Sequence, residues 1–106
     1  MRLNEAASVE YSREQRAVIV SFADGSQASW PVRLLEMTKR TDDGYVAISP
    51  NDDELSAVEL FGGDSILWDK LGQVFRIEDL QNHIYGRKAW MESLTASAMS
   101  RGHLKV

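Results

Sequence analysis

An Asp-Gly pair between two strand-like runs is the feature that most constrains this chain. Residues 17–22 read Ala-Val-Ile-Val-Ser-Phe, and period-two alternation places the apolar side chains at 18, 20 and 22 on one face. Asp24-Gly25 follows, and this dipeptide favours a tight turn because glycine accepts positive φ. Residues 27–30 alternate again. The sequence therefore predicts a hairpin of 17–22 with 27–30. A short strand near residues 9–11 can pair with this hairpin.

A second glycine turn predicts a second hairpin. Residues 57–61 form a strand-like run, and residues 66–68 (Ile-Leu-Trp) form another. Between them lies Gly62-Gly63-Asp64-Ser65, whose glycines suit a turn. A phosphate-binding loop would instead open a helix, and here strand-like residues flank the glycines on both sides.

Proline marks the expected starts of two short helices between these hairpins. Pro31 suits the first position of a helix over residues 32–38, about two turns long. Residues 41–44 (Thr-Asp-Asp-Gly) have the composition of a loop. Ser49 can cap a short second helix, with Pro50 in its first position and acidic residues in its first turn.

The C-terminal part has apolar residues at helical spacing, which predicts one long helix or two helices broken near Gly86. They are Ile77, Leu80, Ile84, Met91, Leu94 and Ala98. Residues 95–106 are expected to form a frayed tail. The pieces sum to a single α+β domain over residues 1–106: a small antiparallel sheet of about four strands in two hairpins, with short helices and a C-terminal helix that covers the sheet.

Composition excludes several classes of protein. The 106 residues contain no cysteine, so a disulfide scaffold, a thiol nucleophile and a thiolate metal site are ruled out. Neither a membrane-spanning run nor a signal-peptide core occurs in the sequence, so a cytoplasmic protein with no membrane partner is expected. The net charge of −4 is unevenly spread: residues 42–79 are strongly acidic and residues 80–106 mildly basic.

No group of residues points to a reaction. The Gly-x-Ser-x-Gly pattern of a nucleophilic serine is absent. Asp79 and His83 would share a helix face, but two ligands do not make a metal site, and a surface pair is expected. The carboxylate pairs at 42–43 and 52–53 lie where loops and helix starts favour acids. We therefore predict no catalytic residue, no metal and no cofactor.

The candidate contact residues lie in Arg87-Lys88-Ala89-Trp90, with Arg101 and Lys105 downstream. Basic residues beside an aromatic ring can contact either nucleic acid or a protein partner. We expect Trp30 and Trp68 in the core, whereas Trp90 fits core and interface equally. Unpaired sheet edges also leave a homodimer open.

Motifs along most of the chain resemble those of the bacterial domain of unknown function family 2442. The resemblance spans residues 9–94 and is carried by 18–25, Pro31, Leu34-Leu35, 53–60, 66–68, Leu71, 77–80, Gly86-Arg87 and Trp90. Where the family has proline after the tryptophan this chain has Asp69, and Gly72 and Val74 replace the family's acids. Arg76 stands in place of its helix-capping serine.

This resemblance implies a small α+β fold without an established activity. Some members resemble the small partner protein of toxin–antitoxin-like gene pairs, and some relatives add a helix-turn-helix domain, for which there is too little chain here after residue 86. The leading hypothesis is a non-enzymatic protein-interaction module, antitoxin-like or an adaptor, that binds another small protein. The alternatives are a DNA-binding regulator that uses residues 87–105, and an unrecognised small-ligand binder.

Overall fold

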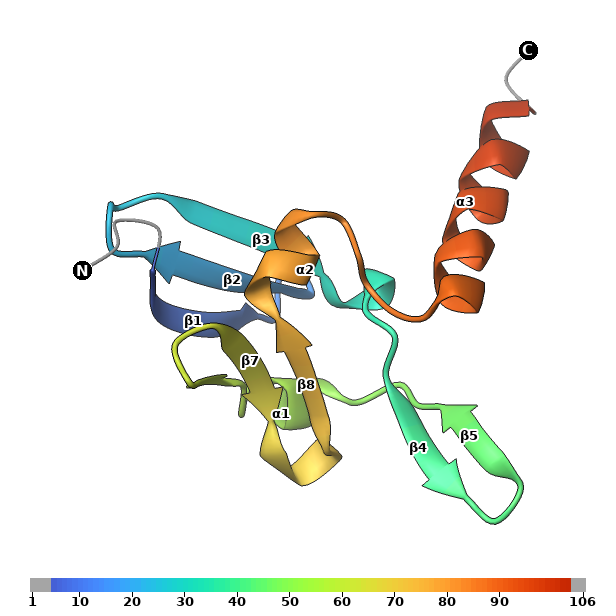
Figure 1. The fold of residues 1–106 in the computed structure, drawn as a ribbon, viewed down its shortest axis with the longest axis horizontal. Helices are drawn as coiled ribbons and strands as arrows, with labels where there is room; N and C mark the ends of the chain where they lie inside the picture. The colour runs from blue at the N-terminus through green and yellow to red at the C-terminus, as the bar shows by residue number, and fades with distance from the viewer. Residues whose placement is uncertain (1–4, 104–106) are drawn as a thin grey trace.

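The computed structural model describes residues 5–103, with side chains described through Thr95, and its fold is α+β. Within that range the strands form two three-stranded antiparallel sheets and one two-stranded sheet (Figure 1). The strands are β1 (Ala6–Ser12), β2 (Ala17–Phe22), β3 (Gln27–Pro31), β4 (Thr38–Thr41), β5 (Gly44–Ala47), β6 (Glu59–Phe61), β7 (Ser65–Trp68) and β8 (Gln73–Arg76). The helices are α1 (Asp52–Leu55), α2 (Ile77–Gln81) and α3 (Lys88–His103), with short 3-10 turns η1 (Val32–Leu34) and η2 (Asp69–Leu71).

The first hairpin confirms the prediction from Asp24-Gly25. Strand β2 lies between β1 and β3, and Val18 is opposite Trp30 in the register of β2 with β3. Gly25 has φ +89°, and the Ser26 N–H donates to Asp24 Oδ1 at 2.8 Å, so the turn uses both residues. Strand β1 is longer than the expected 9–11.

The second hairpin is also confirmed, and it belongs to a sheet of its own rather than to one continuous four-stranded sheet. Strand β7 is central between β6 and β8, and the turn before it has Gly62 and Gly63 at φ +66° and +78°. Strand β6 begins at Glu59, two positions later than expected, and β8 forms where the sequence predicts no strand.

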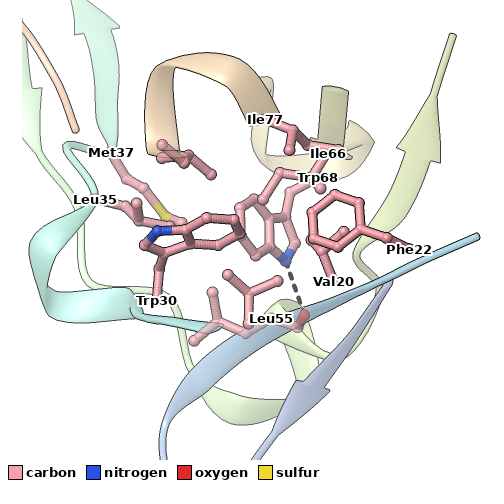
Figure 2. Packing of buried hydrophobic residues seen from close by; sticks show 11 residues of the cluster. Val20, Phe22, Trp30, Leu35, Met37, Leu55, Ile66, Trp68 and Ile77 are labelled. Atoms are coloured by element: carbon pink, nitrogen blue, oxygen red, sulfur yellow. Dashed lines mark hydrogen bonds between the residues drawn. The ribbon is translucent and has the colours of Figure 1, made fainter. Parts of the chain in front are cut away.

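Side chains from both three-stranded sheets meet in one hydrophobic core (Figure 2). Trp68 is only 1% exposed, and its Nε1–H donates to the Leu55 carbonyl at 2.8 Å, so the buried indole nitrogen keeps a partner. Trp30 is also buried, which confirms the prediction for both tryptophans. Helix α2 covers the core with Ile77 and Leu80.

The segment after Pro31 corrects the predicted helix over residues 32–38. Only η1 forms, and the chain then runs extended, so that Leu35 and Met37 both point into the core at period-two spacing. The following residues form β4 and β5, a hairpin that Figure 1 shows extending from the rest of the molecule. The expected loop at 41–44 is its turn.

Helix α1 is short, as expected, but it begins two residues later than Ser49 and Pro50 suggested. Asn51 is its N-cap: the Asn51 side chain accepts from the Glu54 N–H at 2.8 Å, and Glu54 accepts from the Asn51 N–H at 3.0 Å. This reciprocal capping box satisfies two backbone donors, which Ser49 could not do from its position.

Of the two alternatives for the C-terminal part, the structure shows two helices broken near Gly86, because α2 ends at Gln81 and α3 begins at Lys88. The predicted placement of the C-terminal helix is wrong: Figure 1 shows α3 extending away from the sheets instead of covering one. The residues expected to be a tail, 95–106, are helical as far as His103, and 104–106 lie outside the described part. No helix in the described part is long and apolar enough to cross a membrane.

Candidate functional site

Arg87 is the most firmly held of the predicted contact residues. Its Nη2 donates to Glu36 Oε2 at 2.8 Å and its Nε donates to Glu36 Oε1 at 3.1 Å. The Arg87 backbone N–H donates to the same Oε1 at 2.9 Å. The Glu36 carboxylate thus binds both the side chain and the backbone of Arg87, and the positive charge of Arg87 is matched within the chain.

This ion pair changes the titration of Glu36 and joins the residue before α3 to the segment that leads into β4. Hydrogen bonds from the Arg87 side chain lower the pKa of Glu36, against a smaller opposing effect of burial. Glu36 in turn raises the pKa of Arg87. The guanidinium also lies over the Tyr45 ring, with Cζ 5.7 Å from the ring centroid, a cation–π distance.

Trp90 attaches the first turn of α3 to η1. Its Nε1–H donates to the Leu34 carbonyl at 2.6 Å. Trp90 is half-buried, so its exposure is intermediate between that of a core residue and that of an interface residue, the two alternatives that the sequence left open. Lys88 is exposed and forms no ion pair among the described residues. The structure therefore brings Arg87 and Trp90 together against residues 34–36 and leaves Lys88 at the surface.

Gly86 allows this close approach. A Cβ at that position would lie 2.5 Å from Glu36 Cβ and 2.8 Å from Trp90 Cδ1, distances that real side chains do not reach. Next to it the Glu36 N–H donates to the Tyr85 carbonyl at 2.9 Å. The attachment of α3 thus depends on a residue without a side chain.

Exposed apolar side chains surround this attachment. Val74 on β8 is 54% exposed and Ile84 before α3 is 48% exposed; both line a hollow of about 330 Å³ with Tyr85 and Arg87. Tyr45, 61% exposed, lies against Arg87. We call Tyr45, Val74, Ile84, Tyr85 and Arg87 the root surface. Apolar groups gathered around a charged residue are typical of protein contact sites.

The predicted Asp79–His83 surface pair does not form. Helix α2 ends before His83, which has φ +62° and therefore leaves the helical path. Its Nδ1 lies 3.0 Å from the Tyr85 hydroxyl instead. Within residues 5–103, no three side chains of the metal-ligating types converge.

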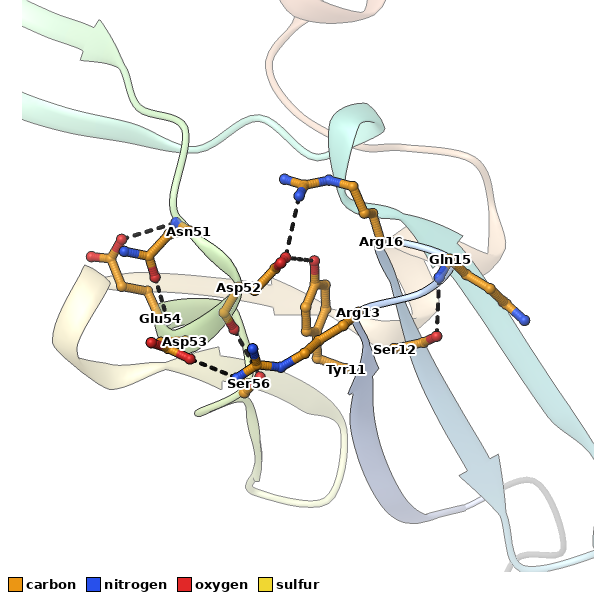
Figure 3. A network of polar contacts seen from close by, with 10 residues as sticks. All are labelled: Tyr11, Ser12, Arg13, Gln15, Arg16, Asn51, Asp52, Asp53, Glu54 and Ser56. Carbon is orange, nitrogen blue, oxygen red and sulfur yellow. Dashed lines mark hydrogen bonds and ion pairs between the residues drawn. The ribbon is translucent and has the colours of Figure 1, made fainter.

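The carboxylates at 52 and 53 hold α1 against the connection between β1 and β2 (Figure 3). Asp52 Oδ1 accepts from the Tyr11 hydroxyl at 2.7 Å and from Arg16 Nη1 at 3.2 Å, and Asp53 pairs with Arg13 at 2.6 Å. Burial, and then the Asp52 carboxylate, raise the pKa of Tyr11. These acids are joined to groups far away in sequence, which gives them a structural role.

The surface hollows do not contain an unpaired buried polar group. One hollow of about 760 Å³ lies between the start of β1, the Gly62-Gly63 turn and the start of α2. Its Arg76 is paired with Glu78 at 3.3 Å. Every buried side-chain nitrogen and oxygen in the described part has a hydrogen-bond partner.

Sequence reasoning missed Glu36 and Tyr45. Glu36 lies in an extended segment far from Arg87 in sequence, and no local sequence pattern predicts such a long-range pair. Tyr45 had a usable signal: an Asp-Gly pair at 43–44 is followed by Tyr-Val-Ala-Ile, the pattern of a strand after a hairpin turn.

Comparisons with known proteins place the chain beside a protein without an assigned role. No family model matches the sequence, and no curated protein matches it. A solved structure, that of a protein of unknown function from Rhodospirillum rubrum ATCC 11170, is similar, with a TM-score of 0.68 and 32% sequence identity. The similarity covers 82% of this chain and 95% of that chain. This chain therefore belongs to the same family as the Rhodospirillum rubrum protein.

Proposed function

We propose that this chain is a non-enzymatic protein-interaction module, of the antitoxin-like or adaptor kind, that binds another small cytoplasmic protein through α3 and the root surface. The supporting observation is the placement of α3. The helix has 16 residues and extends from the body in Figure 1, and the contacts described between it and the rest of the chain come from Trp90 and Met91 near its start.

An isolated helix of this length is only marginally stable in water, because most helical stability in proteins comes from packing one face against other elements. The radius of gyration also indicates that part of the chain extends from the body, because it is 15.0 Å. A compact domain of this length would have about 13 Å. A partner that packs along α3 would supply the missing contacts.

The first two turns of α3 offer a small apolar contact patch. Leu94 lies four positions after Trp90 and three after Met91, so its side chain lies on the same side of the helix as theirs. Trp90 and Met91 contact the body, whereas Leu94 is one turn further out and half-buried. A partner seated on the root surface would continue the packing from Val74 and Ile84 to Leu94.

The same geometry argues against DNA as the main ligand. The charge of the Arg87 guanidinium is already matched by Glu36, which reduces its attraction for a phosphate. The family resemblance to domain of unknown function family 2442, in which some members resemble partner proteins of toxin–antitoxin-like pairs, supports a protein ligand.

A pull-down from native lysate tests the proposal with variants on α3. We expect the tagged chain to retain one protein in stoichiometric amount, and Leu94→Asp to abolish that retention because it places a charge in the apolar contact. Glu92→Gln, an exposed position two residues away, is the matched control and should retain the partner.

Circular dichroism should show that both variants fold. Absence of any stoichiometric protein, or equal retention by the wild-type chain and Leu94→Asp, would contradict the proposal. Retention that requires nucleic acid and weakens steeply with salt would support the DNA-binding alternative instead.

A further inference from the structure

The outer edge of β5 is an unprotected sheet edge. Within residues 5–103 β5 pairs only with β4, so its other side has no strand partner. Edge strands in natural proteins usually carry charges, prolines or bulges that prevent pairing with other chains. The four residues of β5, Gly-Tyr-Val-Ala, include none of these, and Tyr45 and Val46 are 61% and 47% exposed.

The register of the hairpin shows which backbone groups face outward. The Ile48 N–H donates to the Met37 carbonyl at 3.0 Å, so Ile48 turns its backbone groups toward the β4 side. Backbone groups alternate in direction along a strand, and those of Val46 therefore also face β4. The N–H and C=O groups of Tyr45 and Ala47 face the free edge.

We propose that two copies of this chain pair through β5, antiparallel and around a two-fold axis, to form a continuous sheet in the order β4-β5-β5-β4. Hydrogen bonds form between residues whose backbone groups face the edge, and the register that pairs both such residues of β5 in both copies places Tyr45 of each copy opposite Ala47 of the other. The axis then passes between the two Val46 residues, which meet as a close, non-hydrogen-bonded pair. Ala47 is small, so it leaves room for the Tyr45 ring.

Charge complementarity favours a second copy as the occupant of this edge. Continued by two residues, the same register puts Asp43 beside Ser49 of the other copy. Ser49 lines a hollow of about 360 Å³ together with Lys39, Lys70 and the single acid Glu54. Neither lysine forms an ion pair among the described residues. The acidic turn at Asp42 and Asp43 of each copy thus meets two unpaired lysines of the other.

Pairing would also stabilise the hairpin itself. A two-stranded ribbon is only marginally stable in water, whereas a sheet of four strands is more stable. This interface lies on the free edge of β5 and needs neither α3 nor Leu94. Tyr45 also belongs to the root surface, but Val46 belongs only to this interface and Leu94 only to the proposed function, so variants at these two positions distinguish the failure of one from the failure of the other.

A single engineered cysteine tests the geometry, because the native chain contains none. The paired Val46 residues would have Cα atoms about 4.5 Å apart, inside the range of about 4.4–6.8 Å that a disulfide spans. We expect Val46→Cys to form a covalent dimer under mild oxidation at least about tenfold faster than Val74→Cys. Val74 is a matched control, an exposed valine on another edge strand. Equal rates for the two variants would overturn the proposal.

Charge exchange tests the register without a covalent bond. We expect sedimentation equilibrium to show the unmodified chain passing from 11.9 kDa toward twice that mass as concentration rises. Asp42→Lys with Asp43→Lys, or Lys39→Glu with Lys70→Glu, should each weaken dimerisation about tenfold or more by opposing like charges. All four changes together should restore it. A chain that stays at 11.9 kDa, or a fourfold variant no tighter than the double variants, would contradict the interface.

Discussion

Glu36 shows how much one side chain contributes to the placement of a whole helix. Arg87 lowers the pKa of Glu36 below its ordinary 4.5, so ionised Glu36 is favoured in the folded state. A carboxyl group of this kind adds stability that is fully present above its unfolded-state pKa and is lost as the pH falls through its folded-state pKa. Glu36→Gln should therefore lower the melting temperature at pH 7, and should make it fall less steeply than that of the wild type below pH 4.5.

Thermal melts followed by circular dichroism from pH 7 down to pH 3 would measure both effects. Glu92→Gln, on the exposed side of α3, is the control and should leave the melting temperature and its acid slope unchanged. If Glu36→Gln shows the same acid slope as the wild type, the Arg87–Glu36 pair does not contribute to stability in solution.

Gln73 is a further residue whose side chain joins distant parts of the backbone. Its Nε2 donates to the Thr38 carbonyl at 2.7 Å and to the Leu71 carbonyl at 2.9 Å, so the buried amide links β8 to the start of β4. Gln73→Ala removes the donor for two carbonyls, and we expect it to reduce the free energy of unfolding by about 1–3 kcal/mol. Urea denaturation would measure this, with the exposed Gln27→Ala as a near-neutral control. A loss as small as that of the control would show that water replaces the amide.

At the scale of elements, the sequence predicted what local chemistry decides. Asp24-Gly25 and Gly62-Gly63 require positive φ, and the runs beside them alternate, so both hairpins could be placed. The helix expected after Pro31 failed because burial of Leu35 and Met37 outweighs the local preference for a helical start. Strand β4 reads Thr-Lys-Arg-Thr, which lacks an apolar face, and only pairing with β5 makes it a strand.

The candidate site was also predictable only where local sequence decides it. The basic and aromatic residues at 87–90 stand together in the sequence, so they could be selected, but what they contact could not. Glu36 and Leu34 reach them through the fold, and Gly86 matters only because two side chains crowd against it. Spacing along the chain carries information about faces of helices and strands, and it carries none about which elements meet.

At the scale of the whole molecule, the core and the two extending elements should differ in stability. Strands β2 and β7 are each central in a sheet and contribute Val18, Val20, Ile66 and Trp68 to the core, so their amides should exchange with solvent only on global unfolding. In α3 the described contacts with the body involve Trp90 and Met91, so its amides should exchange by local opening. We expect hydrogen exchange in dilute protein to be at least about a hundredfold faster in Lys88–Thr95 than in β2.

This comparison also decides whether α3 needs a partner. If the amides of α3 exchange as slowly as those of β2 in dilute protein, contacts within the chain already stabilise the helix, and the argument for a docking partner loses its basis. If they exchange fast and slow down when the stoichiometric protein from the pull-down is added, the partner supplies the packing that the chain lacks. Amides of β5 separate the two interfaces, because protection at Tyr45 and Ala47 that rises with protein concentration alone would report pairing of two copies.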